Sequence, residues 1–537
     1  MPKTLASLAA SLFILVASDA RSQVTTAQFD NARTGANIHE TVLTPQNVNP
    51  KQFGKLFSYP VDGSVYAQPL YLPGVPIPGK GQRNVVFIAT EHDSVYAFDA
   101  DGVSTEPLWH VSFIRPDEGV TTVPTKDVGR PCLSPEVGIT ATPVIDLKTG
   151  TLYVLTRTKT RKGMFEKDEY VQHLHALAVT TGVEKFGGPV EIRASVPGNG
   201  TGSNQGKIEF DPLRHNARAA LLLVNGTIFA AWGSSCDVRP YHGWVMAYDA
   251  QTLAQKAAFN VSPDAGEGGI WQSDTGIAAD ADGNVYVVTG NGKFDAAANG
   301  RNYGNSVLKL GFNGQGLVVR DYFTPFNHEE LDTNDDDLGA GGPVLLPDPP
   351  AREKPSLGRR MLALAGKGGT LYLIDRENMG KFHAGDDSHA MHTVSTEHRG
   401  FGAPATWNGN LYHLFGNHVL SHYVVDRGKL VLKATARGSK FIIPGATPSV
   451  SANGTQNGIV WVAEWRGWKA TDPPSVLHAY DASNVENELF NSEQNSARDR
   501  LNRILRFAIP TIANGRVYVG AANQVDVYGL LAAPSKK

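Results

Sequence analysis

The sequence predicts an all-β fold, an eight-bladed β-propeller built from four-stranded antiparallel blades. Three observations support this prediction: a repeated strand–turn–aromatic pattern, a further strand in front of each copy, and a segment rich in small residues that recurs eight times. A β-sandwich or a β-helix would explain neither the number of copies nor the four-strand order within each copy.

The repeated pattern is a short strand of alternating polarity, a polar turn that usually carries Asp, and then an aromatic residue. Alternation with a period of two is typical of a half-buried strand. The pattern occupies residues 95–110, 174–186, 245–259, 371–382 and 476–490. We expect its aromatic residues to pack between neighbouring sheets, and they are Trp109, Phe186, Phe259, Phe382 and Phe490.

A segment rich in Ala, Gly and Pro opens each copy, and its small residues suit strands that crowd around a central axis. Several copies continue through Asn-Gly or Asp-Gly, which supply the positive φ that tight hairpin turns require. The eight segments are 67–74, 139–146, 218–225, 275–282, 340–347, 402–408, 446–453 and 508–515. Each therefore begins a unit of four strands, A to D, and eight units predict eight blades.

The two ends of the chain predict how the ring closes. The last copy, after residue 508, contains strands A, B and C and then stops. A spare strand, FGKLFSYPVDG at 53–63, precedes the first copy. We therefore expect this N-terminal strand to become the outer strand of the last blade.

The N-terminus has the features of a targeting segment. Lys3 precedes the apolar stretch 5–17, which is too short to span a membrane, and small residues follow it. We predict a cleaved signal peptide at 1–22 and a secreted or periplasmic protein without a transmembrane segment in the mature chain; an uncleaved anchor is the alternative. The expected domains are an N-terminal extension (23–50), the propeller (51–531) and a C-terminal tail (532–537).

Composition excludes one class of partner and suggests two modifications. The chain has 49 Lys and Arg against 52 Asp and Glu, without a basic block, so we expect no nucleic-acid partner. Export favours a disulfide between Cys132 and Cys236, with two separate buried thiols as the alternative. Glycosylation sequons would matter in a eukaryotic host, and they lie at Asn199, Asn225, Asn260 and Asn453.

The repeat resembles a known family. Residues 153–160 and 175–186, YVLTRTKT and HALAVTTGVEKF, together with the opening ARTGANIHETVLTPQNV at 32–48, are similar to pyrroloquinoline quinone (PQQ)-like repeat propellers of the quinoprotein alcohol dehydrogenase-like superfamily. The resemblance implies an exported oxidoreductase that oxidises an alcohol or sugar in the central funnel, with PQQ and calcium as cofactors.

The chain also departs from that family. It lacks the adjacent cysteines that form a ring over the quinone, and Phe often replaces the docking Trp. It has no Cys-x-x-Cys-His haem motif, so any electron acceptor must be external. The same repeat builds the lipoprotein scaffold of outer-membrane protein assembly, but this chain lacks a lipobox cysteine near its N-terminus.

Candidate site residues follow from their positions in the repeat. In a propeller, the loops that enter strand A and the loops that join B to C share one face around the axis, the usual ligand site. A planar, tricarboxylated quinone needs aromatic platforms and cationic donors, for which we nominate Trp271, Trp465, Arg157, Arg466 and Gln272. A carboxylate must accept the alcohol proton and a cation can polarise a quinone oxygen, so the nominated catalytic residues are Glu136, Asp274, Glu464 and Lys367.

Two segments could hold a metal ion. Asp332, Asn334 and Asp336 alternate like the oxygen ligands that begin a calcium loop, but the later Gly and Glu of an EF-hand are absent, and an acidic turn is the alternative. Residues 383–400 contain four histidines that could bind zinc or lie in a solvated loop: His383, His389, His392 and His398.

Other functions remain open at this stage. The chain could be a propeller without quinone that binds a carbohydrate or a protein partner, or an enzyme of another class, such as a lyase or hydrolase. It contains neither a Gly-x-Ser-x-Gly nucleophile elbow nor a phosphate-binding Gly-Lys-Ser/Thr loop.

Overall fold

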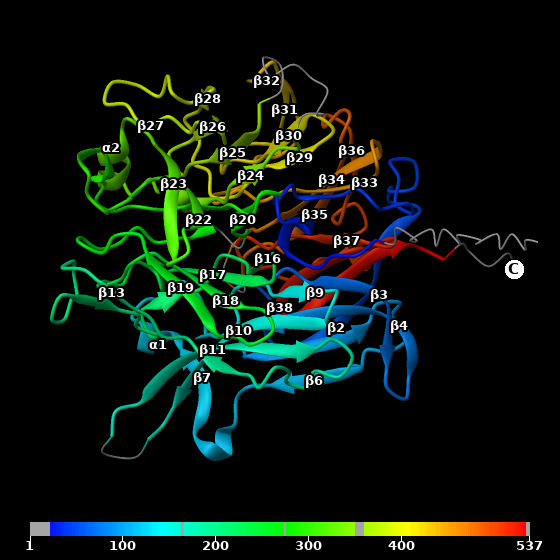
Figure 1. Cartoon of the computed structure of the whole chain (residues 1–537). Helices are drawn as coiled ribbons and strands as arrows, with labels where there is room; N and C mark the ends of the chain where they lie inside the picture. The colour runs from blue at the N-terminus through cyan, green and yellow to red at the C-terminus, as the bar shows by residue number, and fades with distance from the viewer. Residues whose placement is uncertain are drawn as a thin grey trace, which may run out of the picture.

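The computed structural model describes residues 22–162, 166–272, 275–348, 359–467, 469 and 471–532. These residues form nine sheets, eight of which are arranged in a ring, with few and short helices (Figure 1). The predicted eight-bladed propeller is confirmed. The predicted signal peptide, apart from Ser22, lies outside the described residues. In the part of the chain that the structure describes, no helix is both long and apolar enough to cross a membrane.

Each of the first four blades begins with a short inner strand that matches a predicted small-residue segment. Blade 1 consists of β3 (Leu70–Ile77), β4 (Gly81–Thr90), β5 (Ser94–Asp99) and β6 (Trp109–Ser112). Blade 2 consists of β9 (Val144–Asp146), β10 (Thr151–Thr160), β11 (Glu169–Ala178) and β12 (Val190–Glu191). Blade 3 consists of β16 (Leu222–Val224), β17 (Thr227–Ser234), β18 (Trp244–Asp249) and β19 (Gln255–Asn260), and blade 4 of β20 (Ala278–Ala279), β21 (Val285–Val288), β22 (Val307–Phe312) and β23 (Leu317–Thr324).

The next three blades repeat this order. Blade 5 consists of β24 (Val344–Leu345), β25 (Met361–Ala365), β26 (Thr370–Asp375) and β28 (His392–Ser395). Blade 6 consists of β29 (Ala405–Trp407), β30 (Asn410–His413), β31 (Ser421–Asp426) and β32 (Lys429–Thr435). Blade 7 consists of β33 (Ser449–Asn453), β34 (Gln456–Glu464), β35 (Val476–Asp481) and β36 (Glu488–Asn491).

Blade 8 is built from both ends of the chain, as predicted. It contains β37 (Thr511–Ala513), β38 (Arg516–Leu530) and the N-terminal β2 (Phe53–Ser64). β38 turns back at Asn523, which has a φ of 61°, so that it supplies two adjacent strands. β2 pairs antiparallel with its second half, with Phe53 opposite Leu530, and the ring is closed by hydrogen bonds between distant segments.

A buried carboxylate joins the two chain ends at this closure. Asp526 lies on β38 and is buried, and its carboxylate contacts Lys55 Nζ at 2.8 Å, Ser58 Oγ at 2.6 Å and Asn502 N at 2.7 Å. We expect Asp526→Ala to lower the free energy of unfolding by about 2–4 kcal/mol, because it leaves a partly buried ammonium and two donors without their acceptor. Denaturant unfolding measures this loss. The exposed Asp426→Ala serves as control, and equal stability of the two variants would contradict the role of Asp526.

Aromatic residues pack between blades in most, but not all, of the predicted places. Trp109 of blade 1 donates its indole N–H to Val179 O of blade 2 at 3.0 Å, and the ring of Phe490 in blade 7 lies 5.0 Å from that of Phe53 in blade 8. The prediction for Phe382 is wrong. In the fifth copy the chain between β26 and β28 is long, and β27 (Lys381–Phe382) pairs with the edge of blade 4 instead.

Residues 24–37, which we call the N-terminal plug, lie at one end of the central channel and hydrogen-bond to the inner strand of every blade. The plug includes the short helix η1 (Ala27–Phe29) and β1 (Ala36–Asn37), which pairs parallel with β33. Its partners, from blade 1 to blade 8, are Tyr71, Ile145, Leu223, Ala279, Leu345, Thr406, Val450 and Ile512. The contacts fall near the A–B turns, so the plug occupies the end of the channel opposite the loops that enter strand A.

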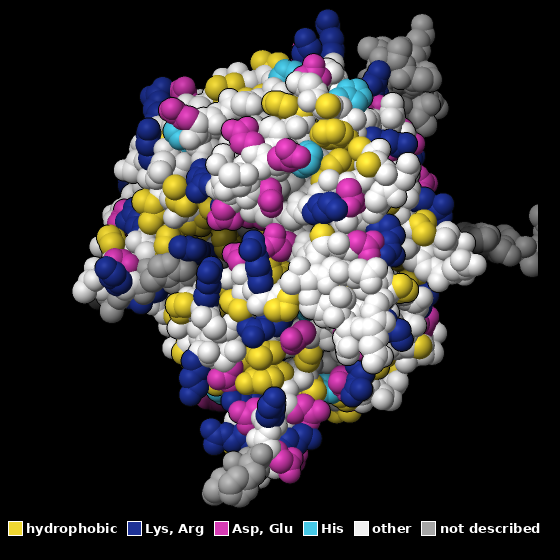
Figure 2. All heavy atoms as spheres, turned by 90° about the vertical axis from the view of Figure 1, so that its left-hand side faces the viewer, with side chains coloured by type: hydrophobic (Ala, Val, Ile, Leu, Met, Phe, Trp, Pro, Cys, Tyr) yellow, Lys and Arg dark blue, Asp and Glu magenta, His cyan; other side chains and the backbone are white. Residues whose placement is uncertain are grey.

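Short helices and strands lie on the face of the propeller opposite the plug, where the loops that enter strand A and the B–C loops are found. The helices there are α1 (Thr125–Val128), α2 (His328–Thr333), η2 (Pro116–Glu118), η4 (Ala296–Ala298) and η5 (Leu338–Ala340), and the additional strands are β7 (Val120–Pro124), β8 (Glu136–Val137), β13 (Ser195–Pro197), β14 (Lys207–Glu209) and β15 (His215–Asn216). The short helix α3 (Ser496–Asp499) packs instead against the start of β2. This face lies on the left in Figure 1 and is turned toward the viewer in Figure 2.

Candidate functional site

The loops that enter strand A converge on a cavity at the axis, which we call the inner pocket. Its volume is about 180 Å³. The loops that lead into blades 1 to 6 and 8, together with the B–C loops of blades 3 and 5, supply its lining: Tyr66, Leu133, Arg218, Trp271, Asp337, Ala340, Phe401, Arg506 and Phe507, with Cys132, Cys236, Asp237 and Lys367. Figure 2 shows this face hollowed near its middle, with basic and acidic side chains gathered around the hollow.

Three cationic side chains of the inner pocket lie over aromatic rings. The Arg218 guanidinium lies 5.1 Å from the centre of the Phe507 ring, and Lys367 Nζ lies 5.6 Å from that of Phe401. Arg506 lies 4.9 Å from the Trp465 ring. Burial, and then the neighbouring charge of Arg218, lower the pKa of Arg506. Two neighbouring arginines in one pocket favour binding of an anionic group.

Asp337 fixes the opposite wall of the inner pocket. Its carboxylate accepts hydrogen bonds from Trp271 Nε1 at 3.0 Å and from Asn291 N at 2.9 Å, and Lys367 Nζ lies 3.4 Å away. Burial raises the pKa of Asp337, although the charge of Lys367 opposes this rise. Asp337 therefore contacts both Trp271 and Lys367, and Lys367 Nζ also pairs with Asp335 at 2.9 Å.

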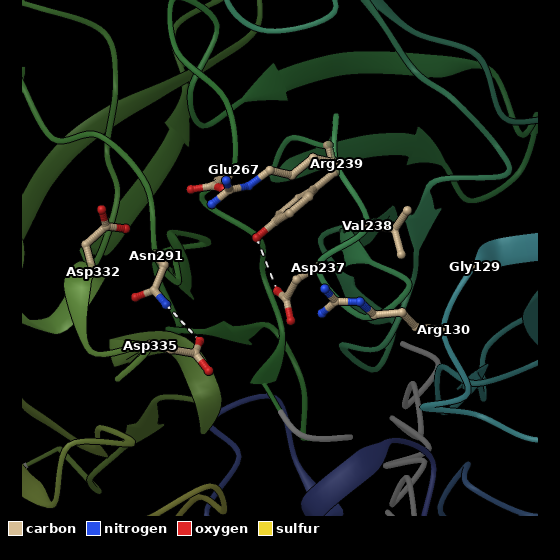
Figure 3. Close-up of a pocket in the computed structure, with 10 residues that line it drawn as sticks. Gly129, Arg130, Asp237, Val238, Arg239, Glu267, Asn291, Asp332 and Asp335 are labelled. Atoms are coloured by element: carbon tan, nitrogen blue, oxygen red, sulfur yellow. Dashed lines mark hydrogen bonds and ion pairs between the residues drawn. The ribbon is translucent and has the colours of Figure 1, made fainter.

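A second cavity, which we call the outer pocket, adjoins the inner pocket at Asp237. Its volume is about 630 Å³, and most of its lining is labelled in Figure 3: Gly129, Arg130, Asp237, Val238, Arg239, Tyr241, Glu267, Asn291, Asp332 and Asp335. Arg130 and Asp237 point toward each other across this space (Figure 3). Asp237 lines both cavities and is the residue that a ligand in either one would meet.

The chain holds Asp237 in place by covalent and hydrogen bonds. The preceding residue, Cys236, forms a disulfide with Cys132, as predicted, and so ties the B–C loop of blade 3 to the loop that enters blade 2. Tyr241 donates its hydroxyl to Asp237 Oδ1 at 3.3 Å. Burial, and then the negative charge of Asp335, raise the pKa of Asp237.

Of the nominated residues, Trp271 and Lys367 line the inner pocket, and Trp465 packs against it through Arg506. Arg157 is not in a loop, because β10 continues to Thr160; its guanidinium is buried and donates to Pro212 O at 3.1 Å and Ser235 Oγ at 2.9 Å. Gln272 is also buried, and its amide donates to Gly276 O at 2.6 Å. Arg157 and Gln272 thus stabilise neighbouring segments through these hydrogen bonds, and they do not line the inner pocket.

The nominated carboxylates lie elsewhere. Glu136 contacts His92 Nδ1 at 2.8 Å and accepts a hydrogen bond from Thr122. Glu464, at the end of β34, forms an ion pair with Arg466 at 2.7 Å and lies 3.3 Å from His478. Arg466 also pairs with Glu493. None of these side chains lines the inner pocket, and Asp274 lies outside the described residues, so their catalytic roles remain predictions.

The predicted metal ligands have other partners in this structure. Asp332 accepts a hydrogen bond from Gly292 N at 2.8 Å, and Asp336 pairs with Arg399, while Asn334 follows the end of α2. The rings of His383 and His389 lie 4.4 Å apart, but His398 lies against His418 instead. Among the described residues, no group of three or more His, Cys, Asp or Glu could hold a metal ion.

Sequence reasoning did not nominate Arg218, Arg506, Phe507 or Asp237. For three of them, the position in the repeat could have indicated that they face the axis. Arg218 is the first residue of the small-residue segment of blade 3, and Arg506 and Phe507 directly precede that of blade 8. Asp237 follows one of the two cysteines, in the B–C loop of blade 3, where an acidic residue has no distinctive sequence context.

The ring of eight blades defines a β-propeller. The chain resembles a quinohemoprotein alcohol dehydrogenase from Pseudomonas putida HK5 with a TM-score of 0.60 and 15% identity over 96% of this chain and 82% of that one. It resembles the corresponding enzyme of Comamonas testosteroni with a TM-score of 0.57 and 14% identity over 95% of this chain and 80% of that one.

A europium-containing methanol dehydrogenase is similar as well, with a TM-score of 0.58 and 13% identity over 95% of this chain and 98% of that one. At such low identity these similarities establish the fold and not the chemistry. No family model matches the chain. No curated protein matches it either.

Proposed function

We propose that this protein is an oxidoreductase that binds pyrroloquinoline quinone in the inner pocket and oxidises an alcohol or sugar that reaches Asp237 from the outer pocket. One observation carries the proposal: three cations and several aromatic rings line the inner pocket, and Asp237, a carboxylate of raised pKa, lies where this pocket meets the outer pocket. The similarity of the fold to quinoprotein dehydrogenases supports it.

The side chains of the inner pocket match the quinone in charge and in aromatic character. A planar ring with three carboxylates needs flat apolar contacts and cationic partners. Trp271, Phe401 and Phe507 supply aromatic surface. Arg218 and Arg506 on one wall and Lys367 on the other can bind carboxylates or a quinone oxygen, and such charge-assisted hydrogen bonds are the strong ones.

When bound, the quinone would supply the acceptor for the two electrons that leave the carbinol carbon as hydride. The protein's part is to take the hydroxyl proton, and Asp237 can do so as a carboxylate whose raised pKa improves it as a base. Tyr241, which donates to Oδ1, leaves Oδ2 available for the alcohol. Lys367, which pairs with Asp335 and Asp337, would provide a positive charge in the inner pocket.

The remaining parts of the proposal concern partners and location. An external electron acceptor is required, because the chain has no haem attachment motif. We derive no step through calcium, since the described residues offer no cluster of metal ligands, and the site at Asp332, Asn334 and Asp336 remains a prediction. We also propose export after removal of residues 1–22. The Cys132–Cys236 disulfide supports an oxidising compartment.

Titration of the mature protein with PQQ, followed by quinone absorbance and calorimetry, tests the proposal. We expect saturable binding with one site per chain. Arg218→Ala and Arg506→Ala should each raise the Kd at least about tenfold, because a charge-assisted hydrogen bond contributes ~1.5–3 kcal/mol. Arg427→Ala serves as control, because Arg427 is exposed and does not line the inner pocket. Absence of quinone binding would refute the proposal and favour a propeller that binds a carbohydrate or a protein.

A further inference from the structure

A third cavity, the distal pocket, continues the outer pocket away from the axis. Its volume is about 420 Å³. It shares Arg239, Tyr241 and Glu267 with the outer pocket, and Thr201 and Lys293 line its far side. The outer pocket in turn shares Asp237 with the inner pocket. The three cavities therefore form one series that runs from the axis outward over blades 3 and 4.

The volume of this series exceeds what a small alcohol needs. Sites that bury a small ligand usually measure ~300–1,000 Å³, and the outer and distal pockets each fall within that range separately, at about 630 and 420 Å³. A ligand that only reached Asp237 would leave the distal pocket without a role. The arrangement fits a ligand with several units in a row.

The charges of the outer and distal pockets nearly balance. Four carboxylates line them, Asp237, Glu267, Asp332 and Asp335, against three basic side chains, Arg130, Arg239 and Lys293. This balance disfavours a polyanion or a polycation, and the density of charged groups disfavours an apolar chain. A neutral ligand rich in hydroxyls can donate to the carboxylates and accept from the guanidinium groups.

One ion pair lies where the outer and distal pockets meet. Arg239 pairs with Glu267, and both side chains lie together in Figure 3. Arg239 is 73% exposed while Glu267 is 19% exposed, so the guanidinium stands at the surface and is held from below by the carboxylate. Such a group presents several N–H donors at a fixed place between two pockets.

We propose that the substrate is an oligosaccharide, with its terminal sugar at Asp237 and its following units in the outer and distal pockets. This inference rests on the proposed oxidation at Asp237, of which it names the substrate class. Lys293 and Arg239 then contact sugar units that do not react. They add to the affinity only of an oligosaccharide that is long enough to reach them.

Binding of two homologous series to the protein without quinone tests the inference: glucose with cellobiose and cellotetraose, and glucose with maltose and maltotetraose, each by calorimetry. In one of the two series we expect affinity to rise at least tenfold from glucose to the tetramer. In Arg239→Ala and Lys293→Ala, the ratio of tetramer affinity to glucose affinity should fall at least fivefold. The matched control, Arg427→Ala, should keep the ratio of the unmodified protein.

The possible failures can be told apart. Affinity that does not change with chain length, or no binding of either series, would overturn the inference. A gain with length that persists in both variants would overturn the assignment to the distal pocket. These measurements need no quinone. If the protein bound the oligosaccharide but not PQQ, the proposed oxidation would be refuted, and the oligosaccharide site would still be supported.

Discussion

Replacing Asp237 with Asn is expected to lower kcat/KM for the oxidation by about 10²–10⁴-fold, the usual contribution of general base catalysis. Asn has nearly the same shape as Asp and can still accept the hydroxyl of Tyr241, so the loop and the disulfide at Cys236 should keep their positions. Quinone binding and the denaturation midpoint should therefore remain close to those of the unmodified protein. A variant that keeps full activity would remove Asp237 from the mechanism.

The pH dependence of the reaction gives a second readout of Asp237. A base acts in its deprotonated form, so kcat/KM should rise with pH through the pKa of Asp237, which burial and Asp335 raise from its ordinary value. Asp335→Asn removes a neighbouring negative charge and should move this rise to lower pH. An unchanged profile in that variant would show that another group titrates. The exposed Asp426→Asn serves as control for the profile.

Replacing Arg33 with Met is expected to lower the free energy of unfolding by about 3–5 kcal/mol, because four acceptors lose the buried guanidinium that they share as donor. Arg33 lies in the N-terminal plug and is fully buried. Its guanidinium donates to Thr26 Oγ1 at 2.6 Å, Ala27 O at 2.8 Å, Ile277 O at 2.8 Å and Leu221 O at 3.0 Å. Met preserves most of the volume but satisfies none of these acceptors.

Denaturant unfolding of Arg33→Met measures the effect, and Arg427→Met, whose side chain is 88% exposed, provides the matched control. Since Arg33 connects the plug to the inner strands of blades 3 and 4, its loss should also speed hydrogen exchange of plug amides before the blades unfold. If Arg33→Met were as stable as the control, the contacts of Arg33 would not contribute to the stability of the ring.

Much of the architecture could be predicted because each of its signals is local. The segment that begins each blade must consist of small residues to fit near the axis. The aromatic residue after each Asp turn must be large enough to fill the space to the next blade, as Trp109 and Phe490 are. Phe382 shows the limit: its segment follows the pattern, but the long chain after β26 carries it to the edge of blade 4.

The site could be predicted only in part. Trp271 and Lys367, both nominated from the sequence, line the inner pocket because a loop that enters strand A and a B–C loop must face the axis. Arg157 and Glu464 lie outside the inner pocket because a strand end can direct a side chain into its own blade as easily as toward the centre. β10 extends through Arg157, and Glu464 lies against His478 on the next strand.

The sequence by itself determined the number of blades, the strand that closes the ring and the face that carries the pocket, since period, turn residues and residue size act over a few neighbouring positions. Only the tertiary structure decided that Arg218, Lys367 and Arg506 converge, that Asp237 stands between two cavities, and that residues 24–37 hydrogen-bond to all eight inner strands. The physical reason is that these contacts join residues from different blades, and their distances depend on how the closed ring sets each blade around the axis.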